Sequence, residues 1–198
     1  IASWIAAGPL MAYGCVFLII FIETGVVFFP FLPGDSLLFA SGFFAHNGGF
    51  NIVALLAVAW TAAILGDQCN FMIGHFFGRK IIVSGKVKAM TPERIKKSED
   101  FLDKWGHLAI FLGRFFPFIR TFVPFIAGMG GMHWRNFVIY NVLGGITWST
   151  VFTLLGYFFG GIPFVQEHFE LLIVGIVAVS IIPTVVGLVK AKLGKKNA

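Results

Sequence analysis

Long apolar stretches without a formal charge dominate this chain. Residues 1–22, 36–66, 136–166 and 171–189 contain no Asp, Glu, Lys or Arg. The chain is 58% hydrophobic and 12% charged, whereas soluble domains are about 45–50% apolar and about 25% charged. The pattern predicts an all-α integral membrane protein that forms one domain over residues 1–198.

Four of the apolar stretches have the length of a plain membrane-spanning helix. They are residues 3–22, 52–78, 136–159 and 171–189, each close to the ~20 residues that one crossing needs. The first is longer than the apolar core of a signal peptide and has no basic residue before it. We therefore expect it to be retained as a span.

Two further apolar stretches contain residues that a plain span does not tolerate. These are 24–45, with Pro30, Pro33 and Gly34, and 108–132, with Pro117, Pro124 and Gly130. Proline removes a backbone donor and breaks the helix, and freed backbone groups are tolerated at membrane depth only inside protein or beside a water-filled cavity. We expect two re-entrant hairpins that enter from opposite faces. If both stretches instead crossed the membrane fully, the charged loops would lie on the same sides as in the hairpin arrangement. The charge pattern alone therefore does not exclude two further spans.

The remaining charges are distributed unevenly. Residues 79–104 carry eight cations against four acids, whereas 161–170 has two glutamates and no Lys or Arg. This asymmetry predicts that a basic loop over 79–107 and both termini are cytoplasmic. The net charge of +6 then reflects topology and attraction to anionic lipid headgroups rather than nucleic-acid binding. A short helix capped by Thr91 is expected at the membrane interface within this loop.

The two halves of the chain resemble each other. Pro-Phe-Leu at 30–32 parallels Pro-Phe-Ile at 117–119, and residues 73–78 parallel 155–160, with offsets of 87 and 82 residues. Inverted repeats with interrupted helices are typical of transporters. We expect a first half over 1–78 and a second half over 108–160 in inverted orientation, followed by a last span and a basic tail over 161–198.

Four charges lie in or directly beside the interrupted stretches: Glu23, Asp35, Arg114 and Arg120. An ionised side chain at bilayer depth costs ~2.5–3.5 kcal/mol on insertion scales, so these residues are candidates for a substrate and coupling-ion site. Arginine presents a planar fork that suits phosphate oxygens, and a carboxylate in a low-dielectric cavity is stabilised in its neutral form. We therefore expect Arg114 and Arg120 to bind a lipid phosphate, and Glu23 and Asp35 to carry protons. The alternative is that the four residues only form two intramembrane salt bridges.

Other residues are expected to line the same cavity, namely Asp67, Asn141, Pro33, Gly34 and Pro117. For Asp67 a helix-packing hydrogen bond is an equally good interpretation, and for Asn141 packing against a neighbour is favoured. The sequence shows no metal-ligand spacing, so we expect no metal and no cofactor, and the proton motive force is the expected source of energy.

The two charged motifs together have a specific spacing. Residues 23–35 read E-T-G-V-V-F-F-P-F-L-P-G-D, and residues 113–124 read G-R-F-F-P-F-I-R-T-F-V-P. With Gly66-Asp67, Tyr140-Asn141 and G-Y-F-F-G at 156–160, the chain closely resembles the DedA family of bacterial inner-membrane proteins over nearly its whole length. This family shares a domain with eukaryotic lipid scramblases of the endoplasmic reticulum.

The resemblance implies both a role for the charged residues and a substrate. In the family an acidic pair and an arginine pair are essential, and these roles carry over to Glu23, Asp35, Arg114 and Arg120. Members recycle undecaprenyl phosphate across the inner membrane. The resemblance thus implies a multi-pass flippase of the bacterial inner membrane whose partner is a polyprenyl phosphate or another anionic lipid.

Three other functions compete with this one. A proton-coupled antiporter would bind a small cation or drug at the acids. An energy-independent scramblase would move bulk phospholipids, and the acids would not change their protonation during transport. A lipid phosphatase is disfavoured because the sequence shows no Ser–His arrangement and no His beside the arginines. Small-residue pairs such as Gly144-Gly145 and Gly160-Gly161 are compatible with a homo-oligomer.

Overall fold

The computed structural model describes residues 1, 3, 8–25, 34–78, 104–168 and 175. Every regular element in these ranges is a helix, which confirms the predicted all-α class. The elements are α2 (Pro9–Gly25), α3 (Gly34–His46), α4 (Ile52–Ile73), the π-helical turn η1 (Gly74–Gly78), the helical residues 104–113, α7 (Pro117–Met129), α8 (Trp134–Phe159) and α9 (Pro163–Glu167).

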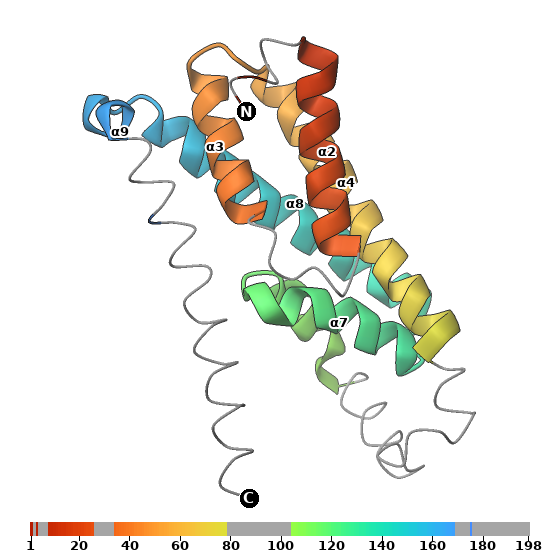
Figure 1. Cartoon of the computed structure of the whole chain (residues 1–198). Coiled ribbons are helices and arrows are strands. Elements are labelled where there is room, and N and C mark those ends of the chain that lie inside the picture. Colours follow the sequence, from red (N-terminus) through yellow and green to blue (C-terminus); the bar gives the residue numbers. More distant parts are fainter. Residues whose placement is uncertain (2, 4–7, 26–33, 79–103, 169–174, 176–198) are drawn as a thin grey trace, which may run out of the picture.

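Helices α4 and α8 cross at the centre of the molecule (Figure 1). Among the described residues, Ile52–Phe77 and Trp134–Phe159 are the helices long and apolar enough to cross a membrane, and they match the predicted spans 52–78 and 136–159. Trp60 Nε1 donates to Thr150 Oγ1 (2.9 Å), and the side-chain amide of Asn141 donates to the Ile64 carbonyl (3.1 Å). Because later residues of α4 meet earlier residues of α8, the two helices are antiparallel.

Helix α2 corrects one predicted boundary. A break was expected between a span ending at residue 22 and a hairpin starting at residue 24, but α2 continues through Glu23 to Gly25. A charged residue does not by itself end a helix, and Glu23 is neutralised by a buried partner described below. The proline-containing residues 26–33 lie outside the described ranges, and α3 starts after them at Gly34.

Helices α2 and α3 run in opposite directions, and α2 is parallel to α4 (Figure 1). The Asn51 backbone N–H at the start of α4 donates to the Tyr13 hydroxyl (2.8 Å). Further along, the backbones of Gly25 and Gly66 pack so closely that a Cβ on Gly25 would lie 3.2 Å from the Gly66 carbonyl oxygen. The described part of the predicted hairpin 24–45 is thus the end of α2 together with α3, and its re-entry from one membrane face stays a prediction.

The second interrupted segment is a helix–turn–helix. Residues 104–113 are helical, the turn is closed by Phe116 N–H donating to the Gly113 carbonyl (3.1 Å), and Pro117 is the first residue of α7, a position where its missing N–H costs nothing. Pro124 lies inside α7 without ending it. The segment begins at or before residue 104 rather than at 108. Its re-entry from one membrane face stays a prediction.

Several predicted segments lie outside the described residues. These are the last span 171–189, the short helix near Thr91 and the basic loop up to residue 103. The sidedness of both termini likewise stays a prediction.

The two halves share a close helix–helix contact. A Cβ on Gly42 of α3 would overlap the carbonyl oxygen of Thr153 in α8. In the same way, a Cβ on Gly128 of α7 would overlap the carbonyl oxygen of Phe71 in α4. The reciprocal contacts are Gly156 with Phe39 and Gly74 with Phe125. Phe71 and Thr153 are 82 residues apart, which is the offset between the repeated motifs at 73–78 and 155–160. The sequence repeat thus corresponds to the same backbone packing in each half.

This packing yields a prediction about stability. We expect Gly42→Ala to lower the thermal unfolding temperature in detergent, because the added methyl group meets backbone and overpacking costs about 1–3 kcal/mol. Gly14→Ala is the matched control, since a Cβ at Gly14 in α2 meets nothing within 4 Å. Equal unfolding temperatures for the two variants would contradict the observed contact between α3 and α8.

Candidate functional site

The four predicted charges all lie inside the protein. Glu23 has no exposed surface, and the exposed fractions of Arg114, Arg120 and Asp35 are 3%, 5% and 9%. They come from three parts of the chain, namely the end of α2, the start of α3 and the helix–turn–helix that carries both arginines. Both arginines bond to carboxylates from the first half of the chain.

Arg120 is bridged by both predicted acids. Its Nη1 lies 2.9 Å from Asp35 Oδ1, and its Nη2 bonds to Glu23 Oε1. The indole N–H of Trp148 also donates to Asp35 Oδ1 (2.9 Å), and the guanidinium carbon lies 5.1 Å from the centre of the Trp148 ring. The tryptophan from α8 therefore holds both members of this ion pair, one by a hydrogen bond and one by a cation–π contact.

The start of α3 is shaped around Glu23. The backbone N–H of Gly34 donates to Glu23 Oε1 (3.0 Å), and a Cβ on Gly34 would overlap the Glu23 carboxylate. A larger residue at this position would therefore displace the Glu23 carboxylate. Asp35 lies in the first turn of α3, where the helix dipole favours a negative charge. Pro33 was also expected to line the cavity, but it lies outside the described residues. Pro117, expected in the same cavity, is the first residue of α7.

Arg114 has a different partner from the one expected. Its Nη2 bonds to Asp67 Oδ2 of α4 and to Asn141 Oδ1 of α8, and it lies 3.5 Å from the Ala63 carbonyl oxygen. Asp67 was expected only to line a cavity or to make a packing bond, but it is the ionic partner of Arg114. The sequence did contain a signal, because Asp67 is the sole formal charge between residues 36 and 78.

Small residues make the space that Arg114 fills. A Cβ on Gly144 would lie 2.9 Å from Arg114 Cδ, and the Cβ on Gly145 would lie 3.2 Å from Arg114 Nη1. Asn141, one turn earlier, both packs against α4 through the Ile64 carbonyl and contacts the guanidinium. The sequence Asn-x-x-Gly-Gly in α8 is therefore part of the arginine site, although packing alone was the favoured interpretation for Asn141.

Asn70, three residues after Asp67 in α4, connects the two interrupted segments. Its side-chain amide donates to the carbonyls of Thr24 (3.2 Å) and Thr121 (2.7 Å). Thr24 lies in the last turn of α2, where carbonyls have no helical partner, and Thr121 follows Arg120 in α7. Asn70 thus fixes the distance between the helix that carries Glu23 and the helix that carries Arg120.

The charges of this network do not cancel. Three carboxylates (Glu23, Asp35 and Asp67) face two guanidiniums, so one negative charge is in excess when all five groups are ionised. The pair Arg114–Asp67 is balanced, and the excess lies on the carboxylates around Arg120. Since an uncompensated buried charge is costly, this cluster favours uptake of one proton or one cation.

Some polar atoms of the network have no hydrogen-bond partner among the described residues. These are Glu23 Oε2, Arg114 Nε and Arg120 Nε, all buried. Buried polar groups are nearly always paired. Each arginine therefore keeps one donor, and Glu23 one acceptor, that a ligand or a proton can occupy. Within the same described residues, no three His, Cys, Asp or Glu side chains come together as metal ligands.

Comparisons with known proteins cover the part of the chain that carries this site. The VTT domain matches residues 32–158, which include every described charge of the network except Glu23. Protein DedA of Escherichia coli (strain K12) is 44% identical over 200 residues, covering 100% of this chain and 91% of that protein. No solved structure matches.

More distant relatives cover most of the chain as well. An uncharacterized membrane protein of Mycobacterium leprae (strain TN) is 39% identical, covering 85% of this chain and 75% of its own length. The inner membrane protein YghB of Escherichia coli (strain K12) is 34% identical, with 80% and 72% covered. The chain therefore belongs to the DedA family of VTT-domain membrane proteins.

Proposed function

We propose that this protein is a proton-coupled transporter that moves a polyprenyl phosphate across the bacterial inner membrane, with undecaprenyl phosphate as the substrate. The observation that carries the proposal is the double bridge of Arg120 by Glu23 and Asp35 inside the protein. The relative named as an inner membrane protein supports the location, and the family resemblance supports the choice of lipid.

The first step of the argument concerns the arginines. A guanidinium offers five N–H donors in a fixed fork that matches phosphate oxygens. Glu23 and Asp35 each bond to one Nη of Arg120, while the Nε donors of Arg114 and Arg120 have no partner among the described residues. A phosphate that binds Arg120 through Nε and the Nη beside it meets the carboxylate already bonded to that Nη, so it competes with that acid for the guanidinium.

The second step concerns the proton. Protonation of Glu23 or Asp35 removes the excess negative charge and weakens the attraction of that carboxyl for Arg120. Arg120 can then pair with a phosphate instead. Loss of the proton restores the carboxylate, which reclaims Arg120 and expels the lipid headgroup. By thermodynamic linkage, a proton that raises phosphate affinity is itself bound more tightly when phosphate is present. Proton and phosphate are therefore carried together.

Arg114 supplies the second half of the headgroup site in this proposal. Its pairing with Asp67 is electrically balanced, so it does not oppose an incoming anion as the cluster around Arg120 does. Its unpartnered Nε and the six-residue spacing to Arg120 favour contact with the same phosphate. Asn141 and Asp67 then act as positioning residues that hold the guanidinium.

The excess negative charge also favours one competing function. A small cation would neutralise the carboxylates around Arg120 as a proton would, so a proton–cation antiporter is the second candidate. In that case Glu23 and Asp35 bind the substrate, and both arginines are structural. Cation binding that competes with protons, in a protein that binds no phosphate, would favour this candidate over lipid transport.

Headgroup binding tests the arginines. We expect Arg114→Ala and Arg120→Ala to weaken binding of undecaprenyl phosphate by about 10- to 100-fold, because a hydrogen bond to a charged group contributes about 1.5–3 kcal/mol. The measurement is lipid binding to purified protein, with uncharged undecaprenol as the ligand control. Arg135→Ala, at an exposed position in α8, is the matched control. Unchanged affinity for undecaprenyl phosphate in both arginine variants would contradict a headgroup site at these residues.

The pH dependence of binding tests the acids. We expect wild-type affinity for the lipid phosphate to rise as pH falls, because protonation of Glu23 or Asp35 releases Arg120. Glu23→Gln and Asp35→Asn should bind the lipid with a flatter pH profile and lose flux driven by a proton gradient in vesicles. Glu167→Gln, at an exposed position in α9, should behave as wild type. A wild-type pH profile in both acid variants would place the coupling proton elsewhere.

A further inference from the structure

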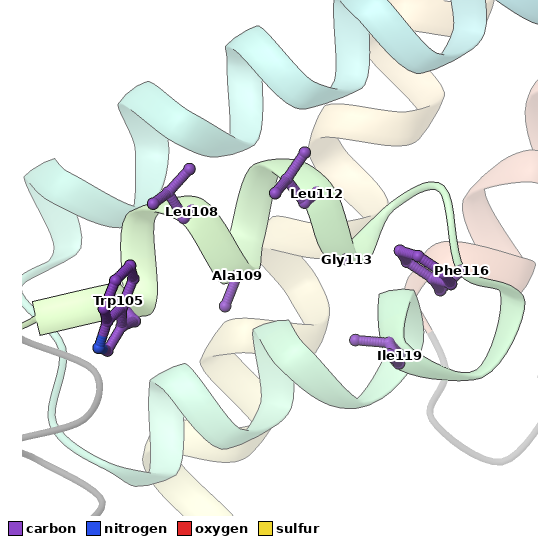
Figure 2. Close-up of a pocket in the computed structure, with 7 residues that line it drawn as sticks. All are labelled: Trp105, Leu108, Ala109, Leu112, Gly113, Phe116 and Ile119. Atoms are coloured by element: carbon purple, nitrogen blue, oxygen red, sulfur yellow. The ribbon is translucent and has the colours of Figure 1, made fainter.

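An apolar groove lies beside the buried ionic network, between helical residues 104–113 and α7 (Figure 2). Its volume is about 360 Å³, within the range of about 300–1,000 Å³ that is usual for ligand pockets. The lining residues are Trp105, Leu108, Ala109, Leu112, Phe116 and Ile119, with Gly113 at the inner end. Exposed apolar side chains are ordinary on a surface that faces lipid, so the concave shape and the position of the groove carry the argument.

The inner end of the groove and the ionic network share one turn of the chain. Gly113 lines the groove, while the next residue, Arg114, directs its guanidinium to Asp67 and Asn141 on the other side. A Cβ on Gly113 would lie 3.2 Å from Ile119 Cγ2, so glycine lets the two arms of the segment approach each other. The apolar groove and the ionic network are therefore separated by the backbone of this one turn.

The opposite end of the groove has residues typical of a membrane interface. Trp105 stands there in Figure 2, and the Lys104 ammonium lies 5.8 Å from the centre of its ring. Trp and Lys are both enriched at the boundary between hydrocarbon and water. Between Trp105 and Gly113 the helix rises about 12 Å, and all the lining side chains are apolar. The groove therefore runs from interface-type residues to Gly113, the residue before Arg114.

We propose that this groove holds the part of the transported lipid's hydrocarbon chain nearest the phosphate that Arg114 and Arg120 bind; the inference rests on the proposed function. The occupant is a single chain attached to a phosphate, because the groove is one apolar hollow of limited volume beside one ionic network. It selects single-chain lipid phosphates over two-chain phospholipids. Ala109, which points from residues 104–113 toward α7 in Figure 2, is the position where a larger side chain fills the groove.

A larger side chain in the groove tests binding of the hydrocarbon chain separately from binding of the headgroup. We expect Ala109→Trp to weaken binding of undecaprenyl phosphate by about tenfold or more while leaving binding of inorganic phosphate unchanged, since several buried CH₂ groups at about 0.8 kcal/mol each are displaced. Ala57→Trp, at an exposed position in α4, should change neither. Undecaprenyl phosphate binding equal to wild type in Ala109→Trp, or equal loss of both ligands, would overturn the proposal.

A photo-crosslinking residue in place of Leu112 identifies the occupant directly. In vesicles that contain undecaprenyl phosphate we expect a crosslink to that lipid, and excess diacyl phospholipid should not compete it away. A crosslink to residues 171–189 of the same chain, or to a second copy, would overturn the proposal.

Undecaprenol, which has the chain but no phosphate, distinguishes failure of the groove from failure of the headgroup site. If the wild type binds no phosphate at all, the headgroup site fails. Crosslinking of undecaprenol at position 112 would then still support the groove as a chain site, and its absence would overturn the groove as well.

Discussion

The structure depends on the neutralisation of five ionised groups that are removed from water. Two guanidiniums and three carboxylates lie buried where α2, α3, α4, α7 and α8 meet. Removing one partner of such a pair leaves an uncompensated buried charge, which costs about 3–5 kcal/mol. The helices that carry these residues are therefore held in register by charge as well as by packing. Since the charges sum to one negative in excess, the same network that stabilises the fold also favours an exchangeable proton.

The network also explains why the interrupted segments are anchored to the long helices. Arg114 bonds to α4 and α8 through Asp67 and Asn141, and Asn70 ties α2 to α7. Glycines at the helix crossings bring the backbones together, and at Gly34, Gly144 and Gly145 they leave room for the charged groups themselves. In this account the two halves of the molecule communicate through Arg120, which belongs to the second half and is held by two acids of the first.

The sequence predicted the two long helices α4 and α8 and the burial of the four central charges, because hydropathy and the cost of burying charge act locally along the chain. It did not predict how the charges pair. Asp67 and Asn70 lie in a helix that is otherwise apolar, and their partners are 46 to 51 residues away. The predicted span ended near residue 22, whereas α2 continues to Gly25 and places Glu23 beside Arg120. Pairings between distant residues depend on the assembled helices, and single-residue properties do not encode them.

The central claim is that phosphate binding at Arg120 and protonation of Glu23 or Asp35 are linked. The most direct test is to count protons exchanged when undecaprenyl phosphate binds, by calorimetry in buffers of different ionisation enthalpy. The account predicts uptake of about one proton per lipid bound, as linkage requires. A double variant, Glu23→Gln with Asp35→Asn, should show none and corrects for titration of the lipid itself. The same proton count in wild type and double variant would contradict the account.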